Sequence, residues 1–492
     1  MDFITELKKE INLCYTENHD IALKSSGSDC LDLFSAVGAL REEYGADVSM
    51  FIKAFMENRN LALKILFYSR DIRNGLGERT IFRRQIAFLG LCYPEVCLKL
   101  IPYISKYGRF DDLLCLLDTD CKREVVKYIS NKLESDLENK KNNKPVSLLS
   151  KWLPSINTSS HQARYYARIL SEELQMTYEE YRKMLSYLRK GLIIENNLRE
   201  KQYDFKYENV PSNAFHKYMN AFIRNDNERF IEFSQKIEEG KAKVNVSTLY
   251  PYKIVHSCIN SFYGNIDDKL IQKDMLNKMW KSLDRQNYIT KAIVVCDGSG
   301  SMYSNTYGGI MPIEVASSLA ILMSEQLTGP FKNTFITFSQ NPQLVTITKD
   351  NIYDKVIQVL NYNEIANTNI SKVYNLILRV ALKNHVNPEE MIDKVIIISD
   401  MEFDAGVSGV STFASFKQKF ALAGYKMPEV IFWNVHSRHQ TVPVAGNEPN
   451  TKLVSGASNK IFDIVLNGKS TTPYEFMIES LEKYSFIDKL FE

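Results

Sequence analysis

The sequence of 492 residues lacks the features of a membrane or secreted protein. It contains no uninterrupted apolar run of about 18 residues, the length that a transmembrane helix needs. Its first residues, MDFITELKKEINL, mix acidic and apolar side chains and have no apolar core of the signal-peptide type. We therefore expect a cytoplasmic protein that makes no contact with a membrane.

Motifs of common enzymes are also missing. We find no Walker-type Gly-x4-Gly-Lys-Ser/Thr motif, no Gly-x-Ser-x-Gly elbow and no His-Glu-x-x-His pair. The formal net charge is only +2, so no global field indicates a nucleic-acid binder. We do not expect an enzyme.

Cysteine is scarce, with eight residues at irregular spacing and no Cys-x2-Cys pair. This usage excludes a disulfide framework. The one cluster, Cys92, Cys97, Cys115 and Cys121, allows a zinc site or buried free thiols on helices, and the spacing favours free thiols.

The length indicates two domains, because one hydrophobic core rarely serves a chain this long. Residues 1–286 read as a succession of amphipathic helices separated by short breaks, which predicts an all-α HEAT-like array or an irregular helical domain. Residues 287–492 alternate between strand and helix patterns, which predicts an α/β, Rossmann-like doubly wound domain. Its expected elements include strands at 395–399, 429–435 and 461–465 and a last helix at 474–484.

The most basic short stretch lies in the helical segment. It contains Arg70, Arg73, Arg79, Arg83 and Arg84, and Lys106 and Arg109 follow on the next helices. One interpretation is a solvated stretch in which Asp71 and Glu78 pair with some arginines. The other is an RNA-binding patch, because guanidinium groups offer forked donors to phosphate oxygens.

Two apolar strands of the second segment each end on an acid. KAIVVCDGSGSM carries Asp297, Ser299 and Ser301, and KVIIISD carries Asp400, with Thr368 in a polar loop between them. Ligands of parallel sheets bind beyond the carboxyl ends of the strands. Alternating carboxylate and hydroxyl oxygens suit a small hard cation, although Asp/Ser/Gly runs also form ordinary turns.

The order of strand-acid, loop-threonine and strand-acid resembles the metal-ion-dependent adhesion site of von Willebrand factor A domains. The resemblance implies that Asp297, Ser299, Ser301, Thr368 and Asp400 surround Mg²⁺ or Mn²⁺, with Asp400 often acting through water. It also implies that an acidic residue of a protein partner binds the ion.

A wider resemblance covers nearly the whole chain. Blocks such as RDIRNGLGERTIFRR, VPSNAFHKYMNAFIRNDNERF, VCDGSGSM and FWNVHS are similar, in order, to those of an uncharacterised family with a von Willebrand A-like C-terminal half. In plan that family resembles the Ro/TROVE ribonucleoproteins, in which a ring of helices closed by a von Willebrand A domain binds small or misfolded RNAs. Two functions follow: an RNA-binding ring or scaffold, or a metal-dependent protein-interaction module without RNA.

Overall fold

The computed structural model describes residues 3–41, 45–260, 266–304, 309–338, 342–362, 370–403 and 412–492. Helices dominate the first part of the chain, and a six-stranded sheet organises the second. We call residues 1–286 the helical half and residues 287–492 the α/β half. Within the described ranges, no helix combines the length and the apolar character that a bilayer crossing requires.

The helical half begins with a helix and a short hairpin before the helical array starts. The α-helices are α1 (Phe3–Asn12), α2 (Asp29–Ala36), α3 (Ala46–Glu57), α4 (Arg59–Arg70), α5 (Arg79–Cys92), α6 (Pro94–Tyr107), α7 (Lys122–Lys141), α8 (Leu149–Trp152), α9 (His161–Glu173), α10 (Tyr178–Arg189), α11 (Ile194–Glu200), α12 (Ser212–Asn225), α13 (Asn227–Glu238), α14 (Pro251–Asn260) and α15 (Ile266–Lys281). The hairpin pairs β1 (Leu13–Tyr15) with β2 (Ile21–Leu23), and a 3₁₀ helix, η1 (Phe110–Leu116), follows α6.

The α/β half is built on one sheet of order β5-β4-β3-β6-β7-β8, parallel except for the edge strand β5. The strands are β3 (Ala292–Asp297), β4 (Thr334–Phe338), β5 (Leu344–Thr346), β6 (Lys394–Ser399), β7 (Glu429–Asn434) and β8 (Thr451–Ser455). The helices are α16 (Pro312–Gln326), α17 (Ile352–Asn361), α18 (Ile370–Lys383), α19 (Thr412–Leu422), α20 (Phe462–Asn467), α21 (Pro473–Leu481) and α22 (Phe486–Phe491).

The central strands are buried on both faces, as expected for the parallel strands of an α/β layer. In the register of β3 and β6, Cys296 lies opposite Ile398. The next residues along both strands therefore leave the sheet at the same edge. This pairing brings the acids that end the two strands, Asp297 and Asp400, to one place.

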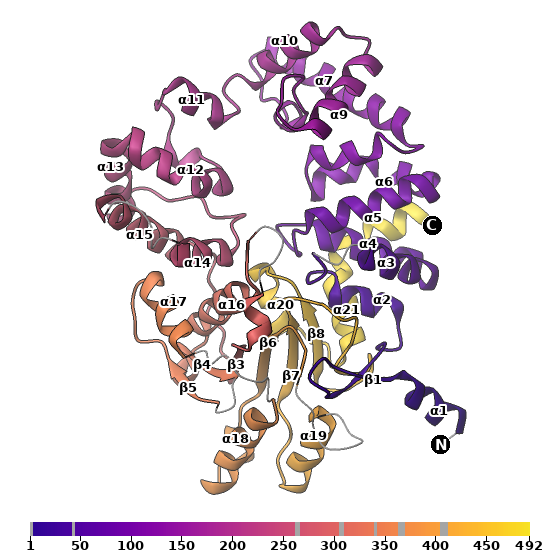
Figure 1. The fold of residues 1–492 in the computed structure, drawn as a ribbon, viewed down its shortest axis with the longest axis vertical. Coiled ribbons are helices and arrows are strands. Elements are labelled where there is room, and N and C mark those ends of the chain that lie inside the picture. Colours follow the sequence, from indigo (N-terminus) through magenta and orange to yellow (C-terminus); the bar gives the residue numbers. More distant parts are fainter. Residues whose placement is uncertain are drawn as a thin grey trace.

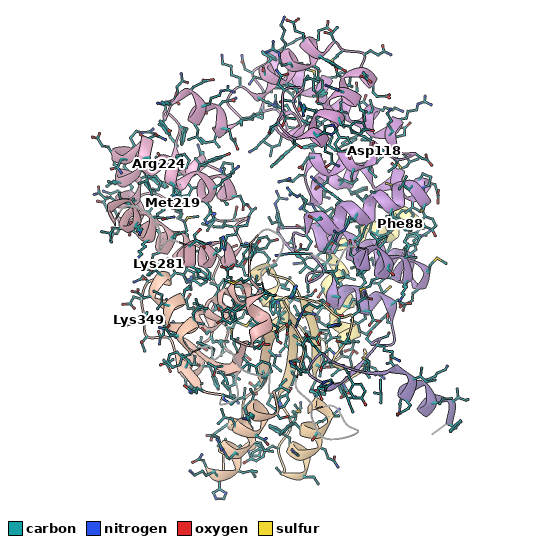
Figure 2. The ribbon with its side chains drawn as sticks, viewed as in Figure 1. Phe88, Asp118, Met219, Arg224, Lys281 and Lys349 are labelled. Atoms are coloured by element: carbon teal, nitrogen blue, oxygen red, sulfur yellow. The ribbon has the colours of Figure 1, made fainter. Side chains whose placement is uncertain are left out.

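The helical half forms an arc whose two ends both rest on the α/β half (Figure 1). At one end α2 packs against β8 and α21, and at the other end α14 packs against α16 and α17. Figure 2 shows the labelled side chains Phe88 and Asp118 on the first arm of the arc and Met219 and Arg224 on the second.

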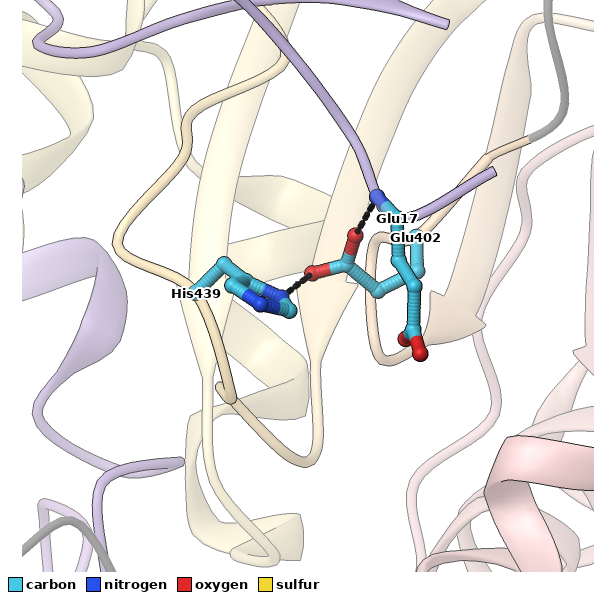
Figure 3. A group of neighbouring side chains, drawn as sticks. All are labelled: Glu17, Glu402 and His439. Carbon is cyan, nitrogen blue, oxygen red and sulfur yellow. Dashed lines mark hydrogen bonds and ion pairs between the residues drawn. The ribbon is translucent and has the colours of Figure 1, made fainter. Parts of the chain in front are cut away.

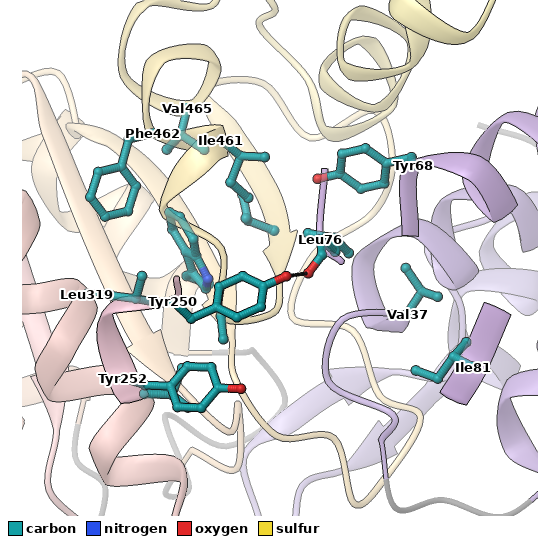
Figure 4. Packing of buried hydrophobic residues seen from close by; sticks show 14 of the residues in the cluster. Val37, Tyr68, Leu76, Ile81, Tyr250, Tyr252, Leu319, Ile461, Phe462 and Val465 are labelled. Atoms are coloured by element: carbon teal, nitrogen blue, oxygen red, sulfur yellow. Dashed lines mark hydrogen bonds between the residues drawn. The ribbon is translucent and has the colours of Figure 1, made fainter. Parts of the chain in front are cut away.

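The two ends of the arc also meet each other, which closes it into a ring. Tyr250, just before α14, is buried and donates a hydrogen bond of 2.5 Å from its hydroxyl to the carbonyl oxygen of Leu76, between α4 and α5 (Figure 4). Beside it, the Arg41 guanidinium lies 5.7 Å from the ring centre of Tyr252. We call this contact between residues 71–79 and residues 250–253 the seam.

Gly77 lets the chain approach the seam closely. Its φ is +68°, in the left-handed region that glycine adopts easily. A Cβ atom added at this position would lie 1.8 Å from the Tyr250 hydroxyl oxygen. Only glycine therefore fits the backbone to the tyrosine at this point.

The last helices return to the helical half. The ring of Phe486 stacks on those of Tyr103 and Tyr107, with centroids 4.5 and 5.1 Å apart, and Lys64 pairs with Asp488 at 2.6 Å. The position near Gln286 at which the sequence divides lies between α15 and β3. The two halves are thus interlocked by segments from both ends of the chain.

Most expected elements of the α/β half are confirmed, but the strand expected at 461–465 is wrong, and the helix expected to be the last, at 474–484, is followed by α22. Residues 459–461 form a 3₁₀ turn and 462–467 form α20. The buried side chains Ile461, Phe462, Val465 and Leu466 recur at helical spacing, and Phe462 packs edge-on against Trp433. Within the cysteine cluster, Cys97 and Cys121 are buried free thiols, whereas Cys92 is exposed.

Candidate functional site

Asp297 ends β3 at the carboxyl edge of the sheet and is fully buried. One carboxylate oxygen accepts the backbone N–H of Ser299 at 2.8 Å, and the other accepts the hydroxyl of Ser399 at 2.6 Å. The tight turn of the loop and the neighbouring strand therefore hold the carboxylate in place. Each oxygen has lone-pair capacity left for a further partner.

Ser299 immediately precedes a short 3₁₀ turn, η3 (Gly300–Tyr303), and Ser301 lies within it. Their hydroxyl oxygens are 3.1 Å apart. The alternation along the loop thus brings two neutral hydroxyl oxygens together next to the residue that carries the carboxylate. Thr368 lies outside the described residues.

Asp400 follows β6 and is also buried. It accepts a hydrogen bond of 3.1 Å from Nη2 of Arg438, which follows β7. The same Nη2 lies 2.7 Å from Oε2 of Glu17, in the N-terminal hairpin. Met401 turns the chain sharply at a φ of +66°, a conformation that non-glycine residues adopt rarely and that concentrates at functional sites.

The electrostatics of this edge favour a bound cation. Burial, followed by the nearby charge of Asp400, raises the pKa of Asp297 to about 7. Two buried carboxylates destabilise each other unless a positive charge lies close to both. The donor set of carboxylate and hydroxyl oxygens fits Mg²⁺, which prefers hard oxygen ligands and retains several waters.

Most arginines of the basic stretch form ion pairs with carboxylates. Arg70 is buried and pairs with Asp112 at 2.7 Å, and Arg83 pairs with the same carboxylate at 2.7 Å. Arg84 pairs with Asp47 at 2.8 Å, and Arg109 pairs with Asp111 at 2.5 Å. The partners are Asp47, Asp111 and Asp112, rather than the Asp71 and Glu78 of the sequence interpretation. Glu78 instead pairs with Arg41 at 2.6 Å.

The remaining basic residues of the predicted patch, Arg73, Arg79 and Lys106, are exposed. Arg79 makes no salt bridge to any described carboxylate. Burial of part of this side chain and the charges of Arg109 and Arg83 lower its pKa. The carboxylates of Asp111 and Asp112 act in the opposite direction but do not offset this lowering of the pKa.

Lys253 adds a cation from the other side of the seam, which sequence reasoning did not identify. Burial and the charges of Arg41 and Arg79 lower the pKa of this lysine. Its Nζ donates a 2.6 Å hydrogen bond to the side-chain oxygen of Asn213. No local signal in the sequence could join Arg79 to Lys253, because they come together only when the ring closes.

We compared the chain with family models, with individual proteins and with solved structures. The model of a domain of unknown function (DUF2828) matches residues 16–125 and 159–288, and that of a second (DUF7788) matches residues 291–485. An uncharacterised protein of Acanthamoeba polyphaga mimivirus is 29% identical over 514 residues, which cover 96% of this chain and 88% of that protein.

Among solved structures, the Deinococcus radiodurans Ro (RSR) protein is similar in fold. The match has a TM-score of 0.50 at 12% sequence identity and covers 90% of this chain and 100% of that chain. At this identity the likeness concerns the fold: a helical half followed by a von Willebrand A-like domain.

Proposed function

We propose that this chain, whose two halves match the DUF2828 and DUF7788 family models and whose fold is similar to that of a Ro protein, is a Ro-like RNA-binding ring. In this proposal the protein is a non-enzymatic binder of small or structured RNA. The observation that carries the proposal is the closure of the helical half into a ring at the seam, in a fold whose match to the Ro protein covers the whole of that chain. The Ro/TROVE resemblance of the sequence points to the same ligand.

The seam supplies chemistry that suits a phosphate. Arg79 begins α5 and Lys253 lies in α14, on opposite sides of the seam, and the charges of Arg41 and Arg79 act on Lys253. Each of the two has a lowered pKa caused by burial and by other cations, so a phosphate would relieve their mutual repulsion. Arginine binds phosphate through a planar fork, and lysine binds it as a point charge.

The second part of the proposal is a magnesium ion at the sheet edge. Asp297, Ser299 and Ser301 would hold the ion directly, and Asp400 would complete its surroundings. When bound, Mg²⁺ would offer an open coordination position to a carboxylate of a protein partner. The chain's own role is to keep Asp297 buried and fixed by Ser299 and Ser399, so that little reorganisation is needed when the ion arrives.

Binding of single-stranded RNA across a salt series tests the RNA proposal. We expect wild type to bind, with log affinity falling linearly as log salt rises. The double variant Arg79→Gln with Lys253→Gln should bind more weakly, and its slope should be shallower by roughly 0.7 for each phosphate that the protein no longer neutralises. Lys332→Gln with Lys469→Gln, two exposed lysines of the α/β half, is the matched control and should retain the wild-type slope.

A second candidate function is a metal-dependent protein-interaction module that binds no RNA. The pairing of Arg70, Arg83, Arg84 and Arg109 with carboxylates favours it, because paired arginines are poorly available to phosphates. Under this alternative, wild type would show no measurable RNA affinity near physiological salt. The helical half would then serve as a scaffold, and the site around Asp297 would bind an acidic partner.

A further inference from the structure

The N-terminal hairpin lies against the carboxyl edge of the sheet, close to Asp400. Leu23 and Val442 exchange two backbone hydrogen bonds of 2.9 Å each, which joins β2 to the loop after β7. The Thr16 hydroxyl donates to the carbonyl of Phe403 at 2.6 Å, and the Asn18 amide donates to the carbonyl of Glu402 at 2.7 Å. A segment some 385 residues away in sequence thus lies over the loop that follows β6.

Glu402 is the fixed centre of this contact. Its side chain is buried, at 1% exposure, yet it carries a carboxylate. One oxygen accepts the backbone N–H of Glu17 at 2.7 Å, and the other lies 3.1 Å from Nδ1 of His439 (Figure 3). Ligand atoms of Glu17, Glu402 and His439 all lie within 4.8 Å of one another.

The charges at this edge are out of balance. Asp297, Asp400 and Glu402 are buried carboxylates, and Glu17 adds a fourth that is exposed. Within the described part of the chain, Arg438 is the guanidinium that contacts them, and it bonds to Asp400 and Glu17 but not to Glu402. The basic partner of Glu402 is His439, whose imidazole is positive only when it is protonated. Because a buried carboxylate is costly without a positive partner, a cation bound here would stabilise Glu402.

We propose that Glu17, Glu402 and His439 form a second cation site, separate from the set around Asp297, that binds Zn²⁺ or a similar borderline transition metal. An imidazole nitrogen with two carboxylates suits zinc, whereas magnesium prefers oxygen ligands alone. The position left open takes water. The site goes beyond the proposed RNA and magnesium functions and depends on neither.

The three side chains have different roles in the proposed zinc site. Buried Glu402 is held by neighbours and fixes the position of the ion. The side chains of Glu17 and His439 are about half exposed, at 48% and 53%, and can rotate towards it. Oε1 of Glu402 and Nδ1 of His439, 3.1 Å apart, already have about the separation of two ligands of tetrahedral zinc with bonds of about 2.0 to 2.2 Å. The main change on binding is a rotation of the Glu17 carboxylate away from Arg438. The ion would tie the N-terminal hairpin to the sheet edge.

Titration of the full-length protein with Zn²⁺ in the presence of saturating Mg²⁺, followed by calorimetry, tests the site. We expect one Zn²⁺ per chain, and we expect His439→Ala and Glu17→Gln each to weaken its binding by about tenfold or more. Co²⁺ should give the visible absorption of a protein-bound ion in wild type and lose it in His439→Ala. His161→Ala, which removes an exposed histidine on α9, is the matched control and should bind Zn²⁺ as wild type does.

Two further readouts separate this site from the magnesium site. Zn²⁺ should slow amide hydrogen exchange of residues 13–23 in wild type but not in His439→Ala. Asp297→Asn should keep the Zn²⁺ affinity of wild type, so that failure of the magnesium proposal leaves this one standing. Absence of Zn²⁺ binding by wild type, or wild-type affinity in His439→Ala, would overturn the proposal.

Discussion

At the scale of single residues, Asp297 is the group on which the magnesium proposal depends. We predict that Asp297→Ala combined with Ser299→Ala abolishes Mg²⁺ binding while the fold survives. The fold should survive because the pair removes a carboxylate whose charge is already disfavoured by burial and by Asp400. Calorimetry with Mg²⁺ measures binding, and circular dichroism of the same samples checks the fold.

The control for this pair is Ser304→Ala, a change just beyond the same turn that leaves both predicted ligands intact. It should bind Mg²⁺ as wild type does. Wild-type Mg²⁺ affinity in the double variant would remove the adhesion-site assignment.

Asp297 and Asp400 could be predicted from sequence because buried parallel strands are apolar runs, and each run here stops on an acid. Parallel pairing then places both acids at one edge. Arg438 and Glu17 could not be predicted in the same way. Their contact joins the loop after β7 to the N-terminal hairpin, and no local sequence pattern predicts a contact between segments so far apart in the chain. Arg70 is an example of a wrong expectation. Its place in a basic stretch suggests a free cation, but it is buried and bound to Asp112, which lies 42 positions away in the sequence.

At the scale of elements, the seam depends on the fit between Gly77 and Tyr250. We predict that Gly77→Ala destabilises the protein by more than the roughly 1 to 2 kcal/mol of a left-handed alanine, because its Cβ also collides with the Tyr250 hydroxyl. Urea denaturation of the variants measures the change in free energy of unfolding.

Gly240→Ala is a matched control for this prediction. Gly240 has nearly the same φ, +71°, and no atom lies within 4 Å of its added Cβ. It should show only the backbone cost. Equal destabilisation by the two substitutions would mean that the close approach at the seam contributes nothing.

A hydrogen bond that joins α12 to α14 should make stability depend on pH. Burial, followed by the charge of Lys253, lowers the pKa of His216 to about 4, and its Nε2 lies 2.9 Å from the hydroxyl of Ser257. The folded state therefore binds fewer protons than the unfolded state, whose histidine titrates near 6.5. The contribution of neutral His216 to the free energy of unfolding is complete above pH 6.5. It is lost as the pH falls towards 4, by up to about 3 kcal/mol.

His216→Gln removes this titration while keeping a polar group beside Ser257. Its free energy of unfolding should change less than that of wild type between pH 7 and pH 4.5, as measured by urea denaturation. His161→Gln, at an exposed position on α9, should follow the wild-type curve. An identical pH dependence in His216→Gln and wild type would contradict the assignment.

The elements themselves were predictable where one pattern dominates. The strands at 395–399 and 429–435 are mostly apolar, with polar residues only near their ends, and they match β6 and β7 closely. The strand prediction for residues 461–465 was wrong because so short a run has no clear period. Phe462 within the run and Leu466 just after it lie at helical spacing and are buried in α20. The extension of the chain into α22 depends on the aromatic contacts of Phe486 with α6, which lies far away in the sequence.

At the scale of the whole molecule, the two-part architecture followed from the sequence but the closure of the ring did not. The amino-acid sequence alone shows a change from helical to strand periodicity near residue 286. Closure depends on Tyr250 meeting Leu76, which are 174 positions apart, and on the accumulated curvature of the helices between them. Small rotations at each helix pair add up along such an array, and sequence patterns do not specify them.

The central claim is that this closed ring holds RNA, and the nucleic acid that accompanies the protein tests it most directly. The full-length chain is purified at moderate salt beside Arg79→Gln with Lys253→Gln, and the bound nucleic acid of each is extracted, quantified and sequenced. We predict that wild type carries enriched small or structured RNA and that the double variant carries much less. Wild type free of nucleic acid, or an equal yield from both proteins, would contradict the claim.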